Sequence, residues 1–201
     1  MVYSNFTLQT VREAFDLEEV DTANLFARSE PMAPSGLLTA VLARDIPLAT
    51  AIGTEKAKSE MIVADVLVEL REQLEHRISL FSGIDFNVDD ESGLTGVCDF
   101  LISLSPVQFG IKAPVIVFVE AKNDNLEVGL GQCVAEMVAA QRFNAEKGND
   151  ILRVYGATTT GVLWRFLKLE EKKLHIDMAV YQIAQCDKVL GILASMVKQK
   201  I

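Results

Sequence analysis

The strongest hydrophobic pattern in the chain is the apolar stretch 114–122, which ends in the two charged residues Glu120 and Lys122. Side chains alternate across a β-strand, so both charges are expected on the same face as Ile116 and Phe118. That face should belong to the core. Because an unpaired buried charge is costly, the two groups need a partner, which could be a metal ion, each other or an anionic substrate.

A second apolar strand is expected at 94–104, and it is interrupted by a single acidic residue, Asp99. If a hairpin joins the two strands with Leu104 opposite Val115, Asp99 lies opposite Glu120. The two carboxylates would then be about 5 Å apart at their Cβ atoms. Like charges in that position repel, so the pattern indicates a cation between them or one protonated carboxyl group. Carboxylate oxygens suit Mg²⁺ or Mn²⁺, which also keep waters and bind substrate phosphates.

Two helices are expected beside these strands. Residues 54–78 have apolar positions at helical spacing, and extending that stripe back by one turn places Glu60 towards the core. A second helix opens near Gly129 and carries Gln132 in its first turn, where the amide could contact a metal-bound water or a phosphate. A further strand is expected at 151–157.

This succession of helix, strand, strand and helix resembles the PD-(D/E)XK nuclease superfamily over about 54–155. The matching motif is Glu120-Ala121-Lys122 at the end of an apolar strand, with Asp99 one hairpin upstream. In place of the Pro of the simplest family pattern, Cys98 precedes Asp99. The resemblance implies a restriction-endonuclease-like core and Mg²⁺- or Mn²⁺-dependent hydrolysis of nucleic acid, with DNA as the expected substrate.

The resemblance also assigns roles to individual residues. Two acidic ligands would bind one or two divalent ions that polarise the scissile phosphate and lower the pKa of an attacking water. The lysine would position that water and stabilise charge on the phosphoryl oxygens. The implied catalytic residues are Asp99, Glu120, Lys122, Glu60 and Gln132, and the implied metal ligands are Asp99, Glu120, Glu60 and the carbonyl group of Ala121.

Each of these residues also has a purely structural interpretation. Glu120 and Lys122 could form an ion pair at an exposed strand end. A register slip of one residue would turn Asp99 outward. Glu60 could be an acidic residue favoured by the dipole of the first helical turn, as could Glu55.

The flanking regions are expected to elaborate one α/β domain with a mixed central sheet between helices. The segments are an N-terminal helical part (1–53), the nuclease-like core (54–157) and a C-terminal hairpin and helix (158–201). Amphipathic spacing predicts a helix at 7–20, and a break precedes the apolar segment 38–52. The hairpin strands are expected at 161–169 and 173–181. The last helix, 186–201, would suit a core groove or a homodimer partner.

Composition limits the function further. The three cysteines are widely spaced, and the two histidines make zinc or Ser-His-Asp chemistry an unfavourable interpretation. No apolar run is long enough to span a membrane and no leader-like pattern opens the chain, so a soluble cytoplasmic protein is expected.

The net charge of −9 opposes nucleic-acid binding, which depends on Lys and Arg. Two alternatives therefore stay open. One is a catalytically silent domain that acts as an interaction or scaffold module. The other is a metal-dependent hydrolase of small nucleotides.

Overall fold

A computed structural model describes residues 2–22, 24–149, 151 and 153–198 of the chain. Within these residues, eight strands form one mixed sheet in the order β1-β7-β6-β5-β4-β3-β2, with β8 paired to β6. The β4–β5 and β1–β7 pairs are parallel, and the remaining pairs are antiparallel. The strands are β1 (Glu18–Thr22), β2 (Ser79–Asp85), β3 (Val97–Ser103), β4 (Val115–Ala121), β5 (Arg153–Thr159), β6 (Leu163–Glu170), β7 (Lys173–Asp177) and β8 (Tyr181–Gln182).

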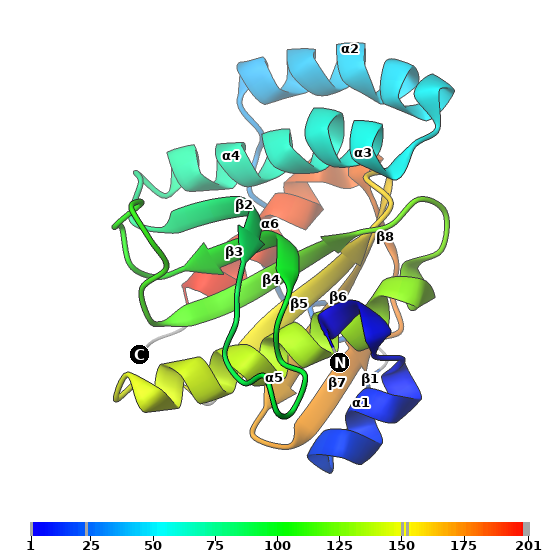
Figure 1. The fold of residues 1–201 in the computed structure, drawn as a ribbon. Coiled ribbons are helices and arrows are strands. Elements are labelled where there is room, and N and C mark those ends of the chain that lie inside the picture. Colours follow the sequence, from blue (N-terminus) through cyan, green and yellow to red (C-terminus); the bar gives the residue numbers. More distant parts are fainter. Residues whose placement is uncertain (1, 23, 150, 152, 199–201) are drawn as a thin grey trace.

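Helices cover both faces of the sheet (Figure 1). On one face lie η1 (Tyr3–Asn5), α1 (Leu8–Phe15) and α5 (Leu130–Glu146), whose apolar residues form one core cluster with the sheet. On the other face lie α4 (Ala64–Gln73) and α6 (Cys186–Val197), which form a second cluster with α2 (Gly36–Ile52). The remaining helical elements are α3 (Glu55–Lys58), the π-helical turn η2 (Ser59–Val63), η3 (Leu126–Gly129) and η4 (Ile183–Gln185).

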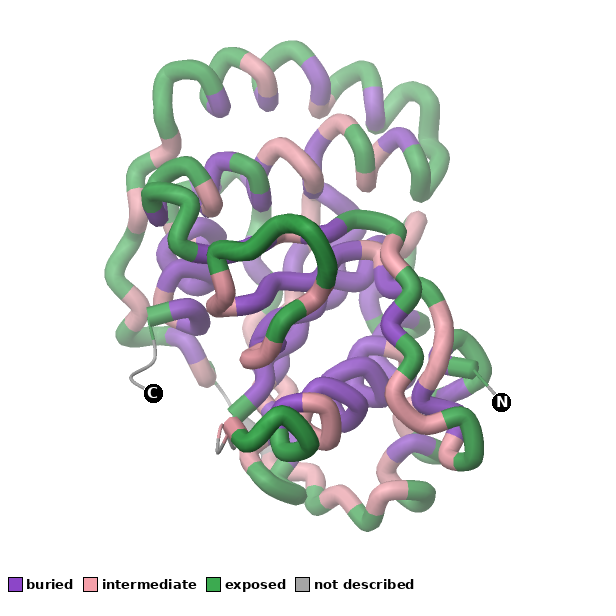
Figure 2. The backbone as a smooth tube through the Cα atoms, turned by 60° about the vertical axis from the view of Figure 1, so that its left-hand side comes forward, coloured by how far each residue is buried: buried purple, intermediate pink, exposed green. Residues whose placement is uncertain are grey.

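Burial is deepest at the centre of these layers. Every residue of β4 is buried, and most of α5 is buried with it. Figure 2 shows the buried positions gathered in the middle of the molecule, with the outer helix α2 exposed along most of its length. The α/β architecture with a mixed sheet between helices is therefore as expected, and strands from the N-terminal, central and C-terminal segments share one sheet.

Local sequence signals account for the helix boundaries. The side chains of Thr7, Ser35 and Thr54 accept hydrogen bonds from backbone N–H groups in the first turns of α1, α2 and α3, which satisfies donors that have no partner inside the helix. Gly53 ends α2 with φ of 72°, a conformation that costs glycine little. Gly53 and Thr54 therefore separate the long apolar helix α2 from α3 and the helical segment that follows it.

Several boundaries differ from those expected. The helix predicted at 7–20 ends at Phe15, because Asp16 adopts a left-handed conformation (φ 53°) and the chain continues into β1. Strand β2 was not predicted. Helix α6 ends at Val197 and packs inside the chain, which is the core-groove alternative of the two expected for it; residues 199–201 lie outside the described residues. So does Leu152 of the strand predicted at 151–157, which is observed as β5.

Tyr3 ties the N-terminal segment to the loop between β2 and β3. Its side chain is buried, and its hydroxyl group lies 2.6 Å from the carbonyl oxygen of Phe86 and 3.1 Å from that of Leu94. We expect Tyr3→Phe to lower the free energy of unfolding by about 1–3 kcal/mol, because the Phe86 carbonyl oxygen loses the hydroxyl donor. The carbonyl oxygen of Leu94 keeps the N–H groups of Val88 and Asp89. Urea denaturation measures this change, and an unchanged midpoint would contradict the anchoring role.

Candidate functional site

Asp99 and Glu120 meet at neighbouring ends of β3 and β4. The register pairs Phe100 with Val119, and extending it by one residue places Asp99 opposite Glu120, as the sequence predicts. At the other end of the pair an irregularity between Ile102 and Ser103 shifts the register, so Val115 faces Ser103 and the predicted pairing of Val115 with Leu104 is wrong. The backbone N–H of Ala121 donates to Asp99 Oδ2 at 2.9 Å, which fixes this carboxylate against β4.

Glu120 is buried and pairs with Lys122. Its side chain is 1% exposed, and Lys122 Nζ lies 2.6 Å from Glu120 Oε1. Within the described residues, Glu120 Oε2 has no hydrogen-bond partner. Burial raises the pKa of Glu120 well above its usual range, and the nearby carboxylates of Glu136 and Asp99 add to the shift. Burial alone would lower the pKa of Lys122, but the Glu120 carboxylate outweighs it, so that pKa is raised and the ammonium form is favoured.

Gln132 extends the cluster from the first turn of α5. Lys122 Nζ donates to Gln132 Oε1 across 3.5 Å, and Gln132 Nε2 donates to Glu136 Oε1 at 3.2 Å. The amide is thereby oriented with its oxygen towards the lysine. The expected proximity of Gln132 to the two strand ends is observed.

Glu136 is a residue that sequence reasoning missed. It is fully buried one helical turn beyond Gln132, and its Oε2 has no hydrogen-bond partner in the part of the chain that the structure describes. Burial raises the pKa of Glu136 to about 8, with Asp99 contributing in the same direction. The available signal was a lone carboxylate in an otherwise apolar stretch, 133–140, four residues after Gln132.

Glu60 does not face the core, contrary to the prediction. Its side chain is 63% exposed and pairs with Lys56 across 3.3 Å on the helix surface. The buried face of the helix includes Ile62 and Val66, so it is rotated away from Glu60, and the π-helical turn η2 breaks the regular spacing on which the extrapolation rested. The carboxylate of Glu55, at the start of α3, instead acts on Lys122 and helps to raise its pKa.

Lys58 supports the loop that leads from β4 to α5. Its ammonium group lies 2.7 Å from the carbonyl oxygen of Asn123 and 3.2 Å from the carboxylate of Asp124. Its side chain is only 12% exposed. These two contacts hold the segment directly after Lys122 against α3.

The set of candidate metal ligands suits a hard divalent ion, although it has two side-chain carboxylates and no third within the described part of the chain. Asp99 and Glu120 present carboxylates from adjacent strands, and the buried Oε2 of Glu120 is an acceptor atom without a hydrogen-bond partner among the described residues. The same residues include no group of three or more His, Cys, Asp or Glu side chains placed to hold a metal. Two carboxylates fit Mg²⁺, which fills its remaining positions with waters and substrate oxygens.

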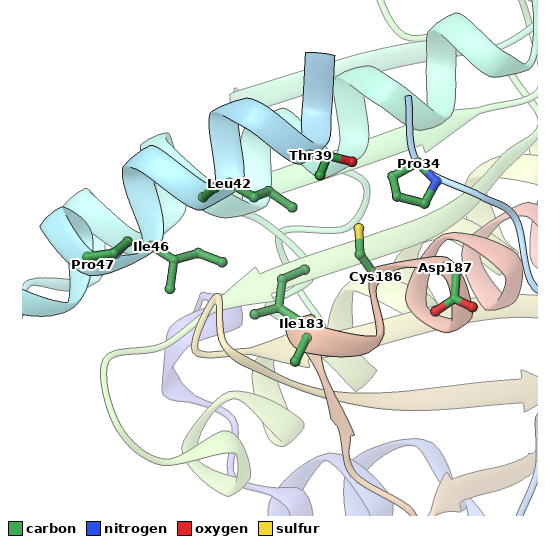
Figure 3. Close-up of a pocket in the computed structure, with 10 residues that line it drawn as sticks. Pro34, Thr39, Leu42, Ile46, Pro47, Ile183, Cys186 and Asp187 are labelled. Atoms are coloured by element: carbon green, nitrogen blue, oxygen red, sulfur yellow. The ribbon is translucent and has the colours of Figure 1, made fainter. Parts of the chain in front are cut away.

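A separate apolar groove of about 520 Å³ opens between α2 and the start of α6. Figure 3 shows Leu42 and Ile46 of α2 facing Ile183 and Cys186 across it. None of the candidate site residues lines this groove. It is therefore distinct from the charged cluster at the ends of β3 and β4.

Comparison of the chain with protein-family models, curated proteins and solved structures finds no match. Among the described helices, none has the length and apolar character needed to cross a membrane. The case for a function therefore depends on the geometry of the site.

Proposed function

We propose that the chain is a Mg²⁺- or Mn²⁺-dependent nuclease with a restriction-endonuclease-like core that hydrolyses phosphodiester bonds of DNA. The observation that carries the proposal is the pairing of Asp99 with Glu120 on adjacent strands beside the half-buried Lys122. Three buried cysteines without disulfides among the described residues agree with the cytoplasmic location that we propose.

The proposed ligands are the carboxylates of Asp99 and Glu120, with the carbonyl group of Ala121 as a further ligand. When bound, the ion would polarise the scissile phosphate and lower the pKa of the attacking water. Lys122 holds an ammonium group beside Glu120, where it can orient that water and stabilise negative charge on the phosphoryl oxygens. Glu60 is left out of the proposed set because its carboxylate lies on the exposed helix surface.

Gln132 supports Lys122 in this proposal. Its amide oxygen faces the ammonium group, and its amide nitrogen is held by Glu136. The side chain therefore restricts the position of Lys122 without adding charge to the site.

The test combines metal binding with cleavage. We expect calorimetric titration with Mn²⁺ to show binding to the wild type and a loss of binding in Asp99→Asn and Glu120→Gln, because each substitution removes a charged ligand. The wild type should cleave DNA with Mg²⁺ or Mn²⁺, and both variants should lose at least about a hundredfold in rate. Single- and double-stranded substrates should be assayed separately.

Glu60→Gln is the matched control, because it makes the same chemical change on the exposed surface of the helix. It should retain both metal binding and cleavage. A folded wild type that binds no Mn²⁺ would refute the proposal. Equal losses in Glu60→Gln and Glu120→Gln would also contradict it, since they would indicate a general effect of charge.

A catalytically silent interaction module is the second candidate. Two observations favour it, namely the net charge of −9 and the burial of Glu120 and Glu136, whose raised pKa values disfavour the ionised ligands that a metal requires. If this candidate is right, the wild type binds no Mn²⁺, and the carboxyl groups of Glu120 and Glu136 serve the packing of α5 on β4.

A further inference from the structure

Arg165 stands in the same row of the sheet as the proposed metal ligands. Glu120 pairs with Thr158 on β5, and Thr158 pairs with Arg165 on β6. Residues paired in this way project to the same face, and neighbouring strands are about 4.8 Å apart, so the Cα atoms of Glu120 and Arg165 are separated by roughly 10 Å. Thr158 between them is fully buried. The row therefore crosses the strands of the sheet from a carboxylate pair to a guanidinium group, near one end of β4 and β5.

The guanidinium group of Arg165 is poorly satisfied. Its side chain is only 20% exposed, and its sole ion pair among the described residues is a loose one, 3.8 Å from the carboxylate of Glu127. Glu127 itself is 72% exposed. Arg165 Nε is buried without a hydrogen-bond partner in the described chain. The buried Nε lacks the hydrogen bond that would offset its desolvation, and the planar fork of donors suits a phosphate or a carboxylate.

A cavity of about 680 Å³ lies directly beside this group. Its walls come from the start of α1, from η3 and α5, and from strands β1, β6 and β7 of the sheet. The charged residues that line it are Arg165, Glu127, Glu19 and Asp177. The space is large enough for a nucleotide-sized group.

The other charges around the cavity are already engaged. Glu19 is paired with Arg12 at 2.6 Å. Asp177 accepts hydrogen bonds from the N–H of Ala179 and from the hydroxyl of Tyr181, each at 3.0 Å. Among the described residues, Arg165 is the one cationic side chain that lines the cavity, and neither Glu19 nor Asp177 is paired with it, so an anionic group would be held at the Arg165 end of the cavity.

We propose that Arg165 binds a phosphate of the DNA strand that flanks the scissile phosphate. The inference rests on the proposed function for the identity of the strand and for the position of the scissile group beside Asp99 and Glu120. The incoming phosphate replaces the loose contact with Glu127, whose exposed carboxylate is then solvated. A fixed contact of this kind gives an acidic protein one local point of attraction for a polyanion.

The test is fluorescence anisotropy of a short labelled single-stranded DNA on the full chain in EDTA, where no metal-dependent cleavage takes place. Arg165→Ala should weaken binding about tenfold, as expected for one charge-assisted contact. The slope of log K against log salt should decrease in magnitude by about 0.7, the value for one phosphate contact on a single strand. Arg165→Lys should fall between the wild type and Arg165→Ala, because it keeps the charge but loses the fork.

Lys172→Ala is the control, since it removes the same charge at the opposite end of the β6–β7 hairpin, where Lys172 pairs with the exposed Asp16. It should leave the affinity and the salt slope unchanged. Circular dichroism must show that every variant is folded. If Arg165→Ala does not fold, Arg165→Lys is the deciding variant. It should keep the wild-type salt slope, because it keeps the charge, and should bind the DNA more weakly than the wild type, because it loses the fork of donors.

The outcomes separate this inference from the proposed function. Binding that depends on Arg165 without any cleavage in Mg²⁺ would refute the nuclease and leave the phosphate contact standing. Cleavage by a protein whose DNA affinity is the same in the wild type and Arg165→Ala would overturn the phosphate contact alone. A wild type that does not bind the DNA overturns it as well.

Discussion

Gly131→Ala is expected to prevent stable folding. Gly131 is the second residue of α5, and the N-terminal segment crosses directly over it between η1 and α1. A Cβ atom added here would lie under 3.0 Å from backbone atoms of Phe6 and Thr7, and backbone cannot move aside as a flexible side chain can. The N-terminal segment would have to lift from α5, which separates Tyr3 and Phe6 from their core. We expect a loss of about 3 kcal/mol or more.

Gly36→Ala provides the comparison. Gly36 is the first residue of α2, and an added Cβ atom would meet nothing within 4 Å. Its free energy of unfolding should stay within about 0.5 kcal/mol of the wild type. Thermal and urea denaturation of both variants measure the difference. A Gly131→Ala protein with a wild-type midpoint would mean that the N-terminal segment contributes little to the stability of α5.

The sequence predicts the central elements of the fold because their signals are local. The stretch that becomes β4 is apolar at nearly every position, and the following helix α5 is long and rich in apolar residues. Strand β2 lacks such a signal, since its residues include Ser82, Gly83 and Asp85 and, among the described strands, it pairs with β3 alone. Strand β1 was not predicted, because the helical spacing of apolar residues continues past Phe15 into the segment that forms it. Its pairing with β7, at the far end of the chain, is a tertiary contact that local patterns do not encode.

The candidate site was predictable to the extent that it follows from strand register. Asp99 and Glu120 are brought together by a hairpin whose irregularity near Ser103 offsets an error in the predicted loop. The positions of the helical carboxylates could not be obtained in this way. Glu60 and Glu136 both occur in helices, and the side chain that becomes buried is decided by how each helix is rotated against the sheet. A single π-helical turn is enough to change that rotation.

The burial of Glu136 should make the stability of the protein depend on pH. Its pKa is about 8 in the folded chain against an ordinary value of 4.5. Below pH 4.5 the carboxyl group is protonated in both states and nothing is lost. Between 4.5 and 8 the unfolded chain releases the proton while the folded chain keeps it, so stability decreases as the pH rises. Above 8 both states are ionised and the full penalty is present.

Glu136→Gln removes this penalty, since the amide keeps an oxygen to accept the hydrogen bond from Gln132 and has no proton to release. We therefore expect the variant to gain stability relative to the wild type between pH 5 and pH 8, by a few kcal/mol at the upper end. Urea denaturation at both pH values measures the gain.

The exposed Glu60→Gln should show no such trend. Parallel pH profiles for Glu136→Gln and the wild type would refute the buried, protonated state of Glu136. A gain that increases from pH 5 to pH 8 would show that the buried carboxyl group of Glu136 is retained at a cost to stability. Such a cost is expected where a residue serves a site and not the packing of the core.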